Sequence, residues 1–235
     1  MAILYGVGVG PGDPDLLTIK ALKIIQSVEH LFVASSTKNQ YSLARRVISP
    51  HLPEGKEIKR LSFPMTYRKE ELKRAWQENA RVVAKALETG DAAFLTLGDP
   101  DLYSTFGYLA REILALVPDL ELEIVPGITA VQAAAARLKL VLTEGEETLL
   151  LASGTRGGEV VKEWAQKTDT LVLYKVYRQA EDILRALKET GRLEETRGIS
   201  FCGMPEEKIY RRLTGKEGPF PYFTLFIVGG KPLKD

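Results

Sequence analysis

The sequence predicts an α/β protein with two α/β domains. The N-terminal domain is expected to hold a mostly parallel sheet with helices on both faces, and the C-terminal domain a mixed sheet with antiparallel strands. Up to about residue 140, short apolar segments alternate with helical patterns, which is typical of a parallel sheet. Beyond that point three apolar segments follow one another closely, which favours antiparallel pairing. The chain of 235 residues is long enough for two modest domains.

In the first domain, each expected strand is an apolar run that leads into an expected helix. Asp13 and Pro14 fit the cap and first position of the first helix. Gly90 ends a long, highly charged helix. The strand that follows is apolar almost throughout, as expected for a strand covered on both faces. The expected strands are 2–9, 29–33, 57–61, 91–97 and 122–125, and the helices are 14–25, 41–49, 67–89, 102–117 and 128–138.

In the second domain, two strand-and-helix pairs precede the closely spaced strands. The expected strands are 147–152, 170–174, 198–201, 208–213 and 222–228, and the helices are 158–166 and 179–190. The segment 215–221 is rich in glycine and proline and is expected to form a hairpin loop. We place the boundary where the rhythm changes, so that the domains are residues 1–142 and 143–235.

Composition excludes several classes of function. The net charge of +1 offers no overall field for nucleic acid or membrane, and we expect neither as a partner. No apolar run of about 18 residues and no export signal are visible, which indicates a cytoplasmic protein. The single cysteine, Cys202, excludes an intrachain disulfide. With one cysteine and two histidines, we expect no thiolate or imidazole metal cluster.

Three turns rich in glycine and proline each follow a strand and open a helix. They are residues 6–14, 97–104 and 125–130. Glycine lets the backbone approach a ligand closely, and the turns of a parallel sheet share the carboxyl edge, where ligands bind. A single such turn is more often only a tight connection. Three on one edge favour a ligand site.

The glycines do not fit the common phosphate-binding patterns. The spacing G-x-G-x-x-G fails, because its last position is Pro11 counted from Gly6 and Asp13 counted from Gly8. The second strand ends in Val-Ala-Ser without the acid that would bind a ribose. No P-loop is present either. The turns therefore favour a ligand that contains a nucleoside but no phosphate group.

Together these segments resemble the tetrapyrrole methylases, a family of S-adenosylmethionine-dependent methyltransferases. The resemblance rests on the segments 6–14 and 17–18, 98–104, 125–129, 170–175 and 203–208, which stand in the family's order over nearly the whole chain. Within the family, the segments 61–65, 98–106 and 126–137 look most like C20-methyltransferases that act on precorrin-2 or cobalt-factor II.

The resemblance implies a homodimer of two-domain chains with S-adenosylmethionine in a cleft between the domains and a tetrapyrrole as substrate. It assigns cofactor-binding positions to Pro11, Gly98, Asp99, Pro100, Tyr103, Ser104, Thr129, Ala130, Lys175 and Gly203. Many relatives carry an apolar residue in place of Lys175. Methyl transfer to an electron-rich carbon needs alignment more than acid–base help, and no catalytic residue is assigned.

Several alternatives stay open. Asp99 either contacts the cofactor or caps the following helix, and Tyr103 is either a core residue or a residue whose hydroxyl meets ligand or solvent. Five arginines are candidates for the substrate's carboxylates, namely Arg45, Arg46, Arg68, Arg156 and Arg178. The methyl acceptor is alternatively another precorrin position, uroporphyrinogen III, a diphthamide precursor or, disfavoured by charge, an RNA ribose. The remaining hypothesis is that the chain is a non-catalytic module that senses a nucleotide.

Overall fold

The computed structural model describes residues 2–36, 42–64, 66 and 68–233. The chain divides into two compact units, Met1–Thr129 and Ala130–Asp235. This division falls earlier than the expected boundary after residue 142, because helix α5 (Ala130–Leu138) belongs to the second unit. The chain runs from α5 directly into β6 (Leu140–Val141), which pairs with β12 (Lys231–Pro232) close to the C-terminus.

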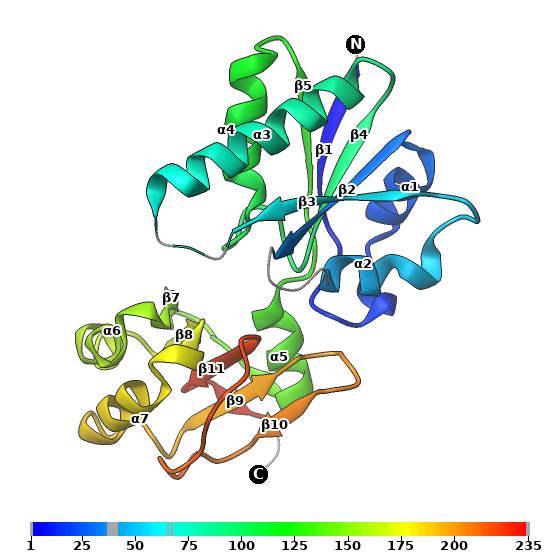
Figure 1. Ribbon diagram of the computed structural model, residues 1–235. Coiled ribbons are helices and arrows are strands. Elements are labelled where there is room, and N and C mark those ends of the chain that lie inside the picture. The colour runs from blue at the N-terminus through cyan, green and yellow to red at the C-terminus, as the bar shows by residue number, and fades with distance from the viewer. Residues whose placement is uncertain (1, 37–41, 65, 67, 234–235) are drawn as a thin grey trace. The chain divides into compact units, whose positions relative to one another are not determined.

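The first unit holds a five-stranded sheet in which every pairing is parallel, as expected (Figure 1). The strand order is β3-β2-β4-β1-β5. The strands are β1 (Ile3–Gly8), β2 (His30–Ser36), β3 (Ile58–Phe63), β4 (Ala92–Thr96) and β5 (Glu121–Val125). Strand β1 lies between β4 and β5, with Val7 opposite Leu95 and Val125.

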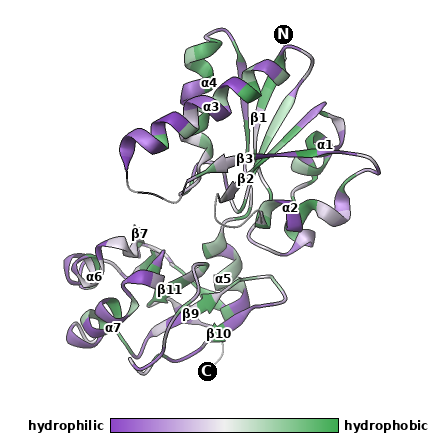
Figure 2. Cartoon of the chain, viewed as in Figure 1, coloured by the Kyte–Doolittle hydropathy of each residue, from purple (hydrophilic) through white to green (hydrophobic). Residues whose placement is uncertain are grey.

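Helices cover both faces of this sheet. Successive side chains of each strand point to opposite faces, so both faces carry apolar side chains that a helix can bury. The side of Leu4, Phe32 and Phe94 packs against α3 (Lys69–Leu87) and α4 (Phe106–Leu116). The side of Val7, Val33 and Leu95 packs against α1 (Ile19–Ser27) and α2 (Leu43–Ile48). Figure 2 shows the same division by hydropathy, with apolar strands inside and much of α3 hydrophilic.

Two helix starts of the first unit differ from the expectation. Asp13 caps a short 3-10 helix, η1 (Pro14–Leu16), while Thr18 caps α1 by accepting from Ala21 N at 3.2 Å. Helix α4 begins at Phe106, four residues later than expected, because Tyr103 has φ +52° and cannot continue a right-handed helix.

The second unit holds a mixed five-stranded sheet of order β10-β9-β11-β8-β7. The strands β7 (Leu149–Ser153) and β8 (Thr170–Tyr174) are parallel, and the other pairings are antiparallel. They complete the sheet with β9 (Thr196–Ser200), β10 (Lys208–Tyr210) and β11 (Thr224–Val228). The expectation of a hairpin loop at 215–221 is wrong, because β10 and β11 both pair with β9 and lie on opposite sides of it.

The core of the second unit lies between this sheet and the helices α6 (Gly158–Trp164) and α7 (Ala180–Glu189). Buried residues of both helices, such as Val161 and Leu187, pack with Leu173 of β8 and Phe226 of β11. Among the residues that the structure describes, no helix is both long enough and apolar enough to span a bilayer.

Candidate functional site

The three glycine-rich turns of the first unit meet at the carboxyl edge of its sheet. Gly10, after β1, and Gly98, after β4, form an antiparallel bridge with N–O distances of 3.2 and 2.7 Å. Val9 N also donates to Thr96 O at 2.9 Å. The β1 and β4 turns are therefore joined through their backbones.

The third turn, after β5, packs against the other two without room for side chains. A Cβ atom on Gly127 would lie 2.1 Å from Gly98 O and 2.8 Å from the backbone of Gly8. A Cβ atom on Gly8 would lie 2.6 Å from Gly98 O and from Gly127 N. Contacts this short exclude any side chain, so glycine at these positions is required by the junction itself.

Asp99 joins the β4 turn to the β5 turn. Its Oδ2 accepts from Gly127 N at 3.0 Å, and its Oδ1 accepts from Asp101 N at 2.9 Å. The expected cap on a helix that starts at Leu102 is not formed, since α4 begins at Phe106. The Asp99 carboxylate therefore holds two turns together, a role that the sequence analysis did not consider.

Space for a ligand remains on one side of this junction. Gly98 is buried, with φ +73°, yet a Cβ atom built on it would meet no heavy atom within 4 Å. The backbone of Gly98 thus borders open space, which fits the close approach of a ligand such as a nucleoside. Pro11 and Pro100, on either side of the bridge, are buried.

The remaining candidates in the β4 turn have different surroundings. Tyr103 is 43% exposed, which excludes a core position, and burial of part of its side chain raises the pKa of the hydroxyl. Ser104 Oγ lies 3.0 Å from Thr96 Oγ1 and accepts from Phe106 N at 3.0 Å, so it fixes the start of α4. Thr129, the last residue of the first unit, is partly buried.

In the second unit, the carboxyl ends of β8 and β9 lie at the same edge of the sheet. Each strand is followed there by a non-glycine residue with positive φ. Lys175 directly follows β8 with φ +58° and precedes the 3-10 helix η4 (Val176–Arg178). Phe201 directly follows β9 with φ +50°, and Gly203 has φ +74°. A non-glycine residue with positive φ costs about 1–3 kcal/mol of folding free energy, and such residues cluster at functional sites.

Aromatic side chains form a row at this edge, which the sequence analysis missed. Tyr177 and Tyr222 have ring centroids 5.0 Å apart, followed by Tyr222 and Phe223 at 4.8 Å and Phe201 and Phe223 at 5.8 Å. Tyr222 and Phe223 are exposed. The available signal was the Pro-Tyr-Phe run before β11, whose side chains lie at the same edge as the ends of β8 and β9.

The candidate arginines for the substrate's carboxylates lie in both units. Arg178 lies 5.4 Å above the Tyr177 ring, at the start of the aromatic row. Arg156 is paired with Glu163 at 3.0 Å on the surface of the second unit. Arg45 lies in α2 and Arg68 caps α3 without a side-chain bond, both in the first unit.

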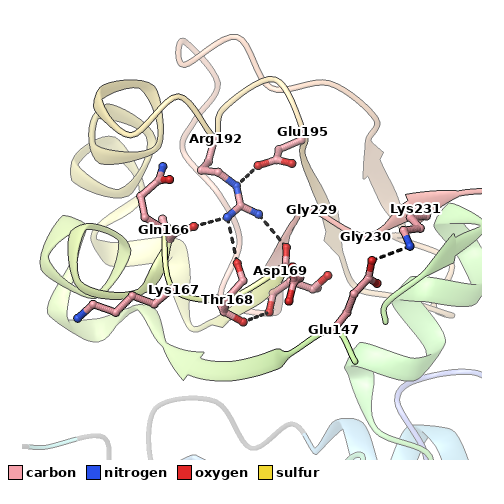
Figure 3. A pocket seen from close by; sticks show the side chains of 12 residues that line it. Glu147, Gln166, Lys167, Thr168, Asp169, Arg192, Glu195, Gly229, Gly230 and Lys231 are labelled. Atoms are coloured by element: carbon pink, nitrogen blue, oxygen red, sulfur yellow. Dashed lines mark hydrogen bonds and ion pairs between the residues drawn. The ribbon is translucent and has the colours of Figure 1, made fainter. Parts of the chain in front are cut away.

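A pocket of about 590 Å³ lies at the opposite edge of the second sheet and contains none of the candidate residues (Figure 3). Arg192 and Lys231 both bond to other residues of its lining. Arg192 pairs with Glu195 and donates to the carbonyl oxygens of Thr168 and Asp169 at 3.2 and 2.8 Å. Lys231 pairs with Glu147 at 2.6 Å. The Arg192 bonds tie the loop before β9 to the loop before β8, and the Lys231 pair ties β12 to the segment before β7, so we assign the pocket a structural role.

The fold and the first unit's edge define a class of protein. It is an α/β protein whose parallel sheet brings three glycine-rich turns together and leaves open space beside one of them. A second α/β unit with a mixed sheet follows it in the chain.

The sequence matches the model of the Tetrapyrrole (Corrin/Porphyrin) Methylases over residues 3–217, so the chain belongs to this family. It is 35% identical over 228 residues to the cobalt-precorrin-2 C(20)-methyltransferase of Salmonella typhimurium, with 96% of this chain and 95% of that one covered. It is 40% identical over 172 residues to a probable cobalt-precorrin-2 C(20)-methyltransferase of Methanocaldococcus jannaschii, with 73% and 71% covered. The resemblance inferred from the motifs is thereby confirmed.

Solved structures of related enzymes share the fold. A cobalt precorrin-4 methyltransferase matches with a TM-score of 0.71 and 23% identity over 97% of this chain and 94% of that one. A uroporphyrin-III C-methyltransferase of Thermus thermophilus, complexed with S-adenosylhomocysteine, matches with a TM-score of 0.66 and 24% identity over 97% of each chain. These matches confirm the two α/β units.

The ten candidate residues thus fall into two groups. In the first unit, the structure brings Gly98 and Asp99 into the junction of the three turns, where Gly8, Gly10 and Gly127 complete it. In the second unit, Lys175 and Gly203 share one edge of the sheet. Their contact with a cofactor stays a prediction.

Proposed function

We propose that this chain is an S-adenosylmethionine-dependent methyltransferase that adds a methyl group to C20 of precorrin-2 or of its cobalt-containing form, in cobalamin biosynthesis. The observation that carries the proposal is its 35% identity to the Salmonella typhimurium C(20)-methyltransferase over almost the full length of both chains. We further propose that it works in the cytoplasm as a homodimer, with neither nucleic acid nor membrane as a partner.

Each unit by itself holds proposed cofactor contacts. Pro11, Gly98 and Pro100 offer backbone that a nucleoside approaches closely, and the open space beside Gly98 supports this role. Asp99 holds the junction through Gly127. Tyr103, Ser104 and Thr129 are the further candidate contacts of the first unit, and Ala130, Lys175 and Gly203 are those of the second unit.

When bound, S-adenosylmethionine would supply an activated methyl group for transfer to C20, in exchange for one proton of that carbon and with S-adenosylhomocysteine as the leaving product. The protein's task is alignment, since holding two reactants at near-attack distance lowers the barrier by several kcal/mol. A rigid junction of three turns, packed glycine against glycine, is suited to that task. Solvent or a substrate carboxylate is sufficient to take the proton.

The proposal is tested by incubating the protein with S-adenosylmethionine and either precorrin-2 or its cobalt form. We expect S-adenosylhomocysteine to form together with a singly methylated product. Carbon-13 from a labelled methyl group should appear at C20. No turnover with either tetrapyrrole would overturn the proposal.

A second candidate is methylation at another position of the ring. The chain is also 27% identical over 222 residues to the cobalt-precorrin-4 C(11)-methyltransferase of Priestia megaterium, with 88% of this chain covered. The 35% and 40% identities to the Salmonella typhimurium and Methanocaldococcus jannaschii C(20)-methyltransferases favour C20. Label at a different ring carbon would support the second candidate.

A further inference from the structure

The turn after β9 is held by the carboxylate of Glu207, which lies at the C-terminal end of the same turn. Glu207 Oε2 accepts from Gly203 N at 2.8 Å, and Glu207 N donates to Met204 O at 2.9 Å. The Glu207 side chain is only 12% exposed, which is low for an acid. The bond fixes Gly203 in the conformation that its φ of +74° defines.

The same carboxylate is bound by an arginine from α5. Arg137 Nε lies 3.0 and 3.1 Å from the two carboxylate oxygens of Glu207, and Nη2 lies 2.5 Å from Oε1. Although burial opposes its charge, Glu207 has its pKa lowered by the bonds from Arg137 and from the Gly203 amide. Glu207 therefore connects the Gly203 turn to α5 through charge-assisted bonds.

Helix α5 carries this connection to a second candidate segment. Ala130 is its first residue and Arg137 lies seven residues further, about 10 Å along the axis at about 1.5 Å per residue. A helix transmits position without bending at this length, so a turn fixed to Arg137 is also fixed relative to Ala130. Ala130 and Gly203 are both proposed cofactor contacts.

We propose that Glu207 is a positioning residue for the cofactor site. It accepts the Gly203 amide and the Arg137 guanidinium at once, and so holds the Gly203 turn at a constant distance from α5. The proposal rests on the proposed function, since it is cofactor binding that requires this constant distance. The competing explanation is that the ion pair only stabilises the second unit.

The test compares four variants of the full chain, with the affinity for S-adenosylhomocysteine measured by calorimetry and the unfolding midpoint by heating. Glu207→Gln removes the charge and one acceptor, whereas Arg137→Gln leaves the bond to Gly203 in place. The double variant Arg137→Glu with Glu207→Arg restores an ion pair, but an arginine at position 207 cannot accept the Gly203 amide. Glu189→Gln is the matched control, because it breaks the exposed pair with Lys162 (2.7 Å) away from the candidate residues.

We expect Glu207→Gln to weaken binding about tenfold, as the loss of a charged hydrogen-bond acceptor does, and Arg137→Gln to weaken it less. The double variant should regain thermal stability while its binding stays weak. In turnover assays, Glu207→Gln should raise the KM for S-adenosylmethionine with little change in kcat, as loss of uniform binding does. Glu189→Gln should leave every value unchanged.

Two results would overturn the positioning role. One is an unchanged affinity in Glu207→Gln with a lowered midpoint, and the other is full recovery of affinity in the double variant. If Glu207→Gln does not fold, Arg137→Gln decides by the same criterion of affinity against midpoint. If the unsubstituted protein does not bind S-adenosylhomocysteine, the proposed function fails, and the positioning role fails with it.

Discussion

The two units hold their strand-end turns by different means. In the first unit, backbone packs against backbone at Gly8, Gly98 and Gly127, a bridge joins Gly10 to Gly98, and the Asp99 carboxylate adds a single bond to Gly127. In the second unit, side-chain charges hold the turns. Glu207 binds Gly203 and Arg137, and Asp182 of α7 accepts from Gly158 N at 2.6 Å.

The difference determines how each unit responds to change. A glycine junction tolerates no added atom, because neither partner can move away without breaking the other contact. An ion pair tolerates side-chain changes but depends on pH and on salt. We therefore expect the first unit's turns to be sensitive to added volume and the second unit's turns to be sensitive to charge.

The largest effect is expected for Gly127→Ala. The added Cβ atom would lie 2.1 Å from Gly98 O, so the turns after β4 and β5 must separate. We expect stability to fall by about 1–3 kcal/mol, as overpacking does, and the affinity for S-adenosylhomocysteine to fall about 100-fold. Gly107→Ala on α4 is the control, since a Cβ atom there meets nothing within 4 Å. Full affinity in Gly127→Ala would show that the junction is not part of the site.

A smaller effect is expected for Gly98→Ala, which separates backbone strain from blockage of the open space. Gly55→Ala is the matched control in the same unit, because both glycines have positive φ (+73° and +76°) and neither Cβ atom would meet anything within 4 Å. Both substitutions should cost about 1–2 kcal/mol of stability. Only Gly98→Ala should also weaken binding, about tenfold, in calorimetry. Equal affinity in the two variants would place the ligand elsewhere.

Local patterns predicted the strands of the two five-stranded sheets, the helices α1 to α7 and the existence of the turns, but not the short strands β6 and β12. Apolar runs such as 91–97 are long enough to identify buried strands, and the glycines and prolines between strand and helix identify the turns. The parallel sheet follows from strand–helix alternation. Each of these patterns is formed by a few residues that are neighbours in the sequence.

The contacts that complete the site involve residues far apart in the sequence. Asp99 and Gly127 are 28 positions apart, and Arg137 and Glu207 are 70 apart, so no local pattern links them. Positive φ at Lys175 and Phe201 has no sequence signal either, since tertiary contacts impose it against the preference of both residues. The compact units divide before α5 and not after residue 142 for the same reason, because α5 resembles the preceding helices in pattern but groups with the second unit.

Asp99→Asn tests whether a side chain contributes to the first unit's otherwise glycine-based junction. An amide has one acceptor oxygen, so it cannot serve Gly127 N and Asp101 N as the carboxylate does. We expect a loss of about 1 kcal/mol in stability and about a threefold loss in cofactor affinity, smaller than for Gly98→Ala. Asp101→Asn, an exposed neighbour, is the control. If Asp99→Asn lost as much cofactor affinity as Gly127→Ala, a side-chain carboxylate would be as important as glycine packing in the first unit, and the two units would not differ in the way described.

The smallest effect is the pH dependence of the bond that holds the Gly203 turn of the second unit. The folded protein lowers the pKa of Glu207 below its ordinary 4.5, so the ionised carboxylate stabilises the fold. That contribution is complete above about pH 4.5 and is lost as the pH falls through the folded-state pKa. The difference in unfolding midpoint between the unsubstituted protein and Glu207→Gln should therefore be constant near neutral pH and shrink below that value. For Gly127→Ala the difference should persist across the same range, because no charge is involved. A pH-independent difference for Glu207→Gln would mean that volume and hydrogen bonding, rather than charge, hold the Gly203 turn, and the two units would then be alike.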